Sequence, residues 1–172
     1  IHQSIGRYLL DSLEKLDNED LLYTVLEHLN KGIQHLSSDE KIYLAQLNNR
    51  AFDKSKKAGA FDHVLYFAVK SNELIDQSVW KSNYNLAFQC HLNHVEALYL
   101  SGKSDAINAV LGSQSANITD LIDIARLREI KISALAQQNQ QEAVYEALNL
   151  LKIMGVNLPK KPGKLLLAKE LI

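Results

Sequence analysis

The scarcity of helix-breaking residues constrains the fold of this chain more than any other feature. Only two prolines occur, Pro159 and Pro162, and the seven glycines fall mostly where helical patterns stop. Proline interrupts the helical hydrogen-bond ladder and glycine weakens helix interiors, so a chain poor in both and rich in Leu, Ala, Lys, Glu and Gln favours helix. Period-two alternation over the length of a strand is hard to find. The sequence therefore predicts an all-α protein.

Apolar residues recur at intervals of three and four, which is typical of helices with one buried face. Ser37 and Glu40 have the spacing of a capping box, in which two side chains satisfy backbone donors reciprocally. Gly59 and Gly102 are predicted to allow turns. The predicted helices cover about 1–16, 20–31, 37–57, 61–76, 78–101, 105–111, 119–138 and 140–154. Side chains predicted to face the core include Leu22, Val25, Leu26, Leu29, Leu44, Leu47, Ala51, Ala58, Val64, Ala68, Leu121, Ala143 and Val144.

Helices in antiparallel pairs form a stack of hairpins, and the tetratricopeptide (TPR) pattern tests whether the stack repeats. That pattern places a small residue at the turn and an alanine about five residues later, where two helices touch. Gly102 followed by Ala106 fits best, and Gly59 followed by Val64 and Ala68 fits loosely. Because the spacings exceed the standard repeat, the prediction is antiparallel hairpins stacked as a TPR-like α-α superhelix. Residues 1–158 form this domain, and residues 159–172 form a connector and the start of a further helix.

Composition excludes several classes of protein. Apolar residues make up 47% of the chain, which argues against disorder, and 19 basic against 20 acidic residues give no basic face for nucleic acid. Apolar runs are far too short to cross a membrane. The charge balance and the short apolar runs therefore predict no nucleic-acid or membrane partner. A single cysteine, Cys90, cannot form an internal disulfide, so we expect a cytoplasmic protein.

Both ends of the sequence look cut. The chain begins at Ile1 with helical periodicity already running, and it ends in an apolar stretch from Lys164 to Ile172. We therefore expect a piece of a longer polypeptide, whose exposed end faces would allow the isolated segment to self-associate.

No residue pattern predicts catalysis or a cofactor. Gly102-Lys103-Ser104 is like the tail of a phosphate-binding loop, but Ala97 stands where that loop needs glycine, and a helix rather than a strand precedes it. His91 and His94 share a helix face and could bind a metal, yet Cys90 points away from that face. Histidines packed between helices are the favoured interpretation, and a metal protein or helical enzyme is the rival hypothesis.

A partner-binding face is the remaining candidate site. Tyr43, Tyr66, Trp80, Tyr84 and Tyr99 could line a groove for a peptide, although such aromatic residues more often fill gaps between helices. The residues placed on the candidate face are Tyr43, Asn48, Tyr84, His91 and His94.

Several segments carry a family resemblance. They are IHQSIGRYLL (1–10), LEHLNKGIQHL (26–36), EKIYLAQLNNRAFDKSKKAGAF (40–61), HVEALYLSGKSDAI (94–107) and EAVYEALNLLKIMGVNLPKKP (142–162). Together they resemble the helical region that follows the AAA-type ATPase module of large bacterial signalling proteins. Those proteins carry a serine/threonine-kinase-like domain before the ATPase, and a GAF domain and a sensor histidine kinase or other output domain after the helices.

The resemblance implies a non-catalytic scaffold that couples the ATPase module to an output domain. Its partners would be neighbouring domains of the same chain and other signalling proteins. The family places no catalytic residues in this region. The alternative is a peptide- or small-molecule-sensing TPR-like domain of a transcriptional regulator.

Overall fold

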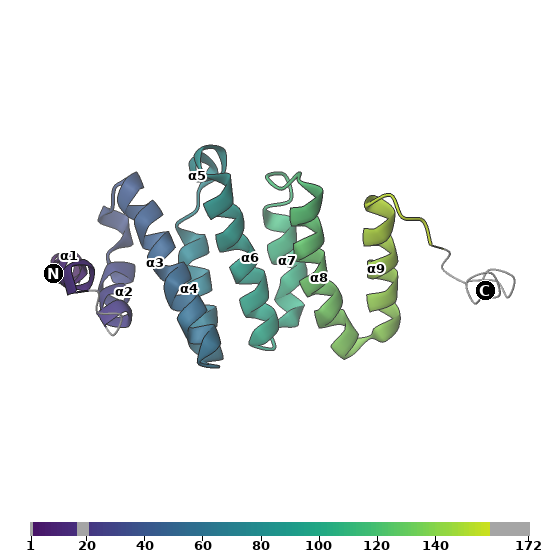
Figure 1. The fold of residues 1–172 in the computed structure, drawn as a ribbon, viewed down its shortest axis with the longest axis horizontal. Coiled ribbons are helices and arrows are strands. Elements are labelled where there is room, and N and C mark those ends of the chain that lie inside the picture. Colours follow the sequence, from purple (N-terminus) through teal and green to yellow (C-terminus); the bar gives the residue numbers. More distant parts are fainter. Residues whose placement is uncertain (1, 17–20, 159–172) are drawn as a thin grey trace, which may run out of the picture. The chain divides into compact units, whose positions relative to one another are not determined.

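A computed structural model describes residues 2–16 and 21–158, which consist of helices and short turns with no strand among them (Figure 1). The all-α prediction is confirmed, and the connector predicted at 159–172 lies outside the described residues. The α-helices are α1 (His2–Leu16), α2 (Leu22–Lys31), α3 (Ser38–Lys57), α4 (Phe61–Glu73), α5 (Gln77–Ser82), α6 (Tyr84–Leu100), α7 (Ile107–Ser113), α8 (Leu121–Gln138) and α9 (Gln140–Ile153). Two 3₁₀ turns, η2 (Ile33–His35) and η3 (Ser104–Ala106), lie before α3 and α7.

Contacts divide the chain into two units, Ile1–Asn117 and Ile118–Ile172. In the first unit, helices that are near in sequence pack on one another: α1 on α2, α3 on α4 and α4 on α6. In the second unit, α8 packs on α9. The boundary between the units falls inside the range 1–158 that the sequence assigns to one repeat domain. No helix in the described ranges has the length and apolar character needed to cross a bilayer.

The start of α3 and the turn after it follow from local chemistry. The Ser37 side chain accepts from the Glu40 backbone N–H, and the Glu40 carboxylate accepts from the Ser37 N–H, so the predicted capping box is confirmed. Gly59 adopts a φ of +68°, which glycine reaches without the steric cost that a Cβ brings. The chain therefore reverses there, and α3 and α4 form an antiparallel hairpin (Figure 1).

The core of the first unit is built mainly from α2, α3, α4 and α6. The predicted apolar positions of α2, α3 and α4 are buried there, whereas Ala58 is exposed because it lies at the helix end beside the turn. In the second unit Leu121 and Val144 are 50% and 56% exposed, contrary to expectation. The buried positions of α8 and α9 are Leu127, Ala134 and Ala143.

The long helix predicted at 78–101 is two helices that meet at Asn83. The backbone of Asn83 leaves helical geometry, with φ −144° and ψ 67°, and its side chain accepts a hydrogen bond from the Leu86 N–H. Asp76 caps the preceding helix through the backbone N–H groups of Ser78 and Val79. Asn and Asp compete with the helical ladder by such local bonds, and this is why the periodic pattern alone missed the break.

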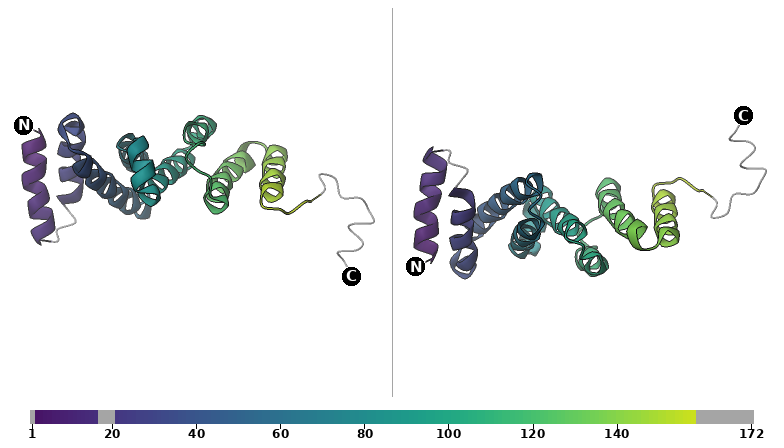
Figure 2. Two further views of the ribbon diagram at one scale, coloured as in Figure 1. Left: turned by 90° about the horizontal axis from the view of Figure 1, so that it is seen from above. Right: turned by 90° about the horizontal axis from the view of Figure 1, so that it is seen from below.

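A close approach joins α1 to α2, which lie side by side in the two views of Figure 2. Gly6 is buried at this contact, and a Cβ placed on it would lie 2.6 Å from Leu29 Cδ2. Glycine at this position therefore allows the two helices to pack closely.

The residues expected between helices from the repeat pattern differ in their burial. Val64 and Ala68 of the α3–α4 hairpin are fully buried, although they fit the repeat pattern only loosely. Ala106, which fits best, is exposed. Gly102 does form the predicted turn: its φ is +68°, and Lys103 N–H bonds Leu98 O at 2.8 Å.

Candidate functional site

Asn48, one residue of the candidate partner-binding face, lies inside the core. Its side chain is fully buried on α3 and exchanges two hydrogen bonds with Asn30 of α2, at 2.9 and 3.0 Å. Asn48 Nδ2 also donates to Leu44 O at 2.9 Å. Its hydrogen-bonding groups are used within α3 and between α2 and α3, so Asn48 is not available to a partner and belongs to the packing of these helices.

His91 is likewise buried rather than on a surface. Within the described residues neither of its ring nitrogens has a hydrogen-bond partner, and the same holds for His94 Nδ1. Burial, with a smaller contribution from His94, lowers the pKa of His91 to about 4. The ring is therefore neutral at pH 7 and packs edge-on against Trp80, with ring centroids 6.3 Å apart. A site that requires an exposed His91 is excluded by this burial.

The other three candidate residues are partly exposed. Tyr84 stacks on Phe88 and meets Trp80 edge-on, at centroid distances of 6.0 and 5.8 Å. Tyr43 packs against the core of the first unit. His94 is partly buried, and this burial lowers the pKa of its imidazole. Trp80 thus brings Tyr84 and His91 to one aromatic cluster, whereas Asn48 pairs with Asn30. The five residues therefore do not form a single exposed face.

Among the described residues, no third metal ligand lies beside His91 and His94. Cys90, the neighbour of His91 in sequence, accepts a hydrogen bond from Asn49 Nδ2 at 3.2 Å, and Asn49 Oδ1 accepts from Asn93. No group of three or more His, Cys, Asp or Glu side chains among the described residues could hold a metal ion.

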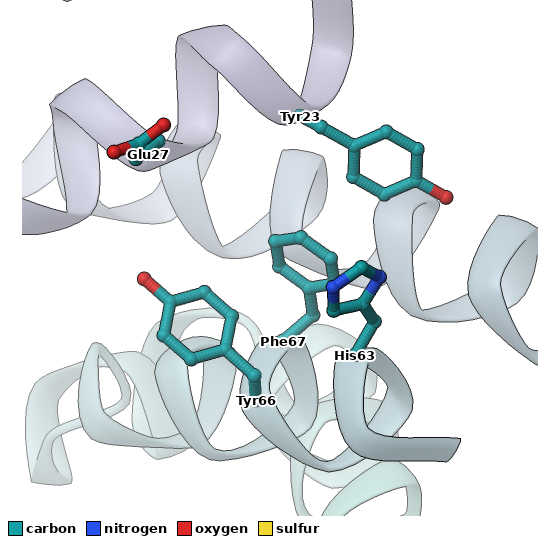
Figure 3. A pocket seen from close by; sticks show the side chains of 5 residues that line it. All are labelled: Tyr23, Glu27, His63, Tyr66 and Phe67. Carbon is teal, nitrogen blue, oxygen red and sulfur yellow. The ribbon is translucent and has the colours of Figure 1, made fainter. Parts of the chain in front are cut away.

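An accessible pocket of about 310 Å³ opens between α2 and α4. Its lining residues are Tyr23, Glu27, His63, Tyr66 and Phe67. Figure 3 shows Tyr23 and Tyr66 on opposite sides with Phe67 between them, and Glu27 projecting from α2. The Phe67 centroid lies 5.5 Å from that of Tyr23 and 5.1 Å from that of Tyr66. Phe67 is buried and Tyr66 is 41% exposed, so the pocket has an apolar floor and open aromatic walls.

Contacts with neighbouring side chains fix the chemistry of this pocket. Tyr23 Oη lies 3.3 Å from Ser55 Oγ, which orients the ring, and the Lys54 ammonium lies 5.4 Å from the centroid of that ring. Glu27 accepts a hydrogen bond from Lys31 Nζ at 2.8 Å. This bond and the Lys31 charge hold the pKa of the Glu27 carboxyl below its ordinary value, so Glu27 is ionised at neutral pH. The pocket thus combines aromatic faces with an exposed carboxylate that is paired with Lys31, and the Lys54 ammonium lies over one of its rings.

Sequence reasoning identified only Tyr66 of this pocket. A signal for the others exists, because Tyr23 and Glu27 are four residues apart and His63, Tyr66 and Phe67 are three and four apart. Residues at these spacings share a helix face. What the sequence does not contain is that the two faces oppose each other, since this depends on how α2 and α4 pack around α3.

No protein-family model, curated protein sequence or solved structure matches this chain.

Proposed function

We propose that this chain is a non-catalytic helical scaffold and protein-interaction segment of a multidomain signalling protein, in which it couples an ATPase module to an output domain. The observation that carries the proposal is the packing of the first unit, where helices near in sequence contact one another through antiparallel hairpins. Such stacks form elongated elements with large surfaces that transmit displacement and bind other proteins. The sequence resemblance supplies the signalling context.

The direct test is the coding sequence on either side of these 172 residues. An ATPase module with a phosphate-binding loop before the segment, and a GAF or kinase module after it, would support the scaffold. Neighbours of unrelated type, or a chain that stands alone, would contradict the signalling context.

A coupling measurement would then test the mechanism in the full-length protein. The Asn48→Ala substitution removes the amide pair that joins α2 to α3. We expect it to weaken the response of the output domain to ATP while ATP hydrolysis continues. Asn108→Ala, a substitution at an exposed position of α7, is the control and should leave the response unchanged. An unaltered response in the Asn48 variant would contradict transmission through these helices.

A peptide- or small-molecule-sensing domain of a transcriptional regulator is the second candidate function. The pocket between α2 and α4 favours it, because it is accessible and lined by aromatic residues. A DNA-binding module beside the segment would distinguish this candidate from the scaffold.

A further inference from the structure

We propose that the pocket between α2 and α4 binds the guanidinium group of an arginine side chain from a partner protein. The inference rests on the proposed interaction role and names the chemistry of one contact. It follows from the lining residues, the charge at the mouth of the pocket and a cation that the same aromatic cluster already holds.

The walls of the pocket suit a flat cation. The faces of tyrosine and phenylalanine rings carry negative potential that attracts cations, and a planar guanidinium also stacks on such faces. Tyr66 meets Phe67 at an interplanar angle of 76°, so the two rings present surfaces in different directions to one space. The volume of about 310 Å³ is at the lower end of the range for ligand sites and admits one long side chain.

The cluster already receives one cation from its own chain. The Lys54 ammonium lies over the Tyr23 ring, at 5.4 Å from the centroid. A tyrosine face in this cluster therefore already contacts a positive charge. Because Lys54 occupies that face, the Tyr66 ring, which is 41% exposed and lines the pocket, is the tyrosine available to the arginine.

Glu27 supplies the complementary charge. Its side chain is 63% exposed and its present partner, Lys31, is 49% exposed on the same helix. An exposed lysine–carboxylate pair of this kind contributes little to stability, so an incoming arginine can replace it. Arginine is favoured over a second lysine because its fork bonds both carboxylate oxygens and because it gives up its hydration more easily.

The test uses the whole 172-residue chain, with NMR detection of tyrosine and phenylalanine ring protons. N-acetyl-arginine amide is the probe, and N-acetyl-citrulline amide is its uncharged counterpart of nearly the same shape. We expect arginine to shift the resonances of Tyr23, Tyr66 and Phe67 together, and citrulline to shift them much less at equal concentration. Equal shifts with both probes, or no shift with arginine, would overturn the proposal.

Two variants locate the contact. Glu27→Gln removes the negative charge, and Tyr66→Leu removes one aromatic ring but keeps an apolar side chain. Each substitution should weaken arginine binding by about two- to fivefold. Glu73→Gln is the matched control, since Glu73 is also an exposed acid paired with a lysine of its own helix, Lys70. It should bind arginine as the parent does. Binding unaffected by Glu27→Gln would also overturn the proposal.

The two proposals fail separately. A negative arginine titration removes the pocket assignment and leaves the scaffold, which depends on the flanking coding sequence. Flanking sequence without signalling modules removes the scaffold, and the arginine titration still reports on the pocket.

Discussion

Asn30 and Asn48 exchange two amide hydrogen bonds across the contact between α2 and α3, at 2.9 and 3.0 Å, with both side chains buried. The next residue along α3, Asn49, faces α6 instead, where it bonds Cys90 and Asn93. Two consecutive asparagines therefore connect one helix to two different neighbours. Because a buried amide is costly unless it is bonded, these pairs favour one register of the helices over others.

Removing one member of the Asn30–Asn48 pair should destabilise the first unit. Asn48→Ala leaves the Asn30 amide buried without its partner, and we expect a loss of about 2 kcal/mol in the free energy of unfolding. Urea unfolding followed by Trp80 fluorescence measures it. Asn108→Ala, at an exposed position, should change the unfolding free energy by less than about 0.5 kcal/mol. The double variant Asn30→Leu with Asn48→Leu should lose less unfolding free energy than the sum of the losses measured for Asn30→Leu and Asn48→Leu separately. Strict additivity would contradict the coupling.

These asparagines show where prediction from the sequence stops. The apolar positions predicted for α2 are buried, as are Leu44, Leu47 and Ala51 of α3, because burial follows helical periodicity, whereas Ala58 at the end of that helix is exposed. The turns at Gly59 and Gly102 follow from glycine chemistry. Asn48, which is assigned from the sequence to a partner-binding face, is fully buried instead. Only the packing of α2 on α3, which the sequence does not contain, supplies the Asn30 amide that makes its burial favourable.

The candidate site was predictable to the same limited extent. Tyr66 belongs to the aromatic set that the sequence identifies, but the pocket needs α2 and α4 to oppose each other. From the sequence, His91 is interpreted as a residue packed between helices and is also assigned to the candidate binding face. Its full burial agrees with the packing interpretation. The break at Asn83 was missed because a local side-chain bond outweighs an uninterrupted apolar pattern.

The neutral, buried His91 should make stability depend on pH in a defined window. In the unfolded chain the imidazole titrates near 6.5, and in the folded protein its pKa is about 4. Between these values the unfolded state binds the proton and the folded state does not, so stability is fully present above pH 6.5 and falls as the pH falls toward 4. The loss from this group is about 3 kcal/mol. Urea unfolding at a series of pH values measures it.

His91→Leu should reduce that dependence on pH and keep or raise the stability at pH 7, because an unbonded polar ring is replaced by an apolar side chain. His94, whose pKa burial also lowers, accounts for part of the remaining slope. The exposed His63 provides the control, and His63→Gln should retain the full acid dependence. An identical slope in the His91 variant and the parent would show that another group is responsible.

Cys90 should be unreactive until the protein unfolds. Burial raises the pKa of its thiol to about 11 from an ordinary value of 9.0, so at pH 8 the thiolate is about a hundredfold scarcer than in an exposed cysteine. Because the chain has one cysteine, a thiol reagent such as dithionitrobenzoate reports on this site alone. Labelling should be very slow in buffer and fast in concentrated urea. Rapid labelling of the folded protein would show that α6 separates readily from α3.

Two glycines should respond in opposite directions to the same substitution. Gly102→Ala places a Cβ in the left-handed region after α6, at a φ of +68°, and we expect a loss of about 1 kcal/mol in unfolding free energy. Gly112 lies inside α7, and a Cβ added there meets no atom within 4 Å among the neighbours considered, so Gly112→Ala should stabilise the protein by about 0.5 kcal/mol through its higher helix propensity. Urea denaturation of the two variants beside the parent gives both values. If both substitutions stabilised the protein, the turn at Gly102 would not require a residue in the left-handed region.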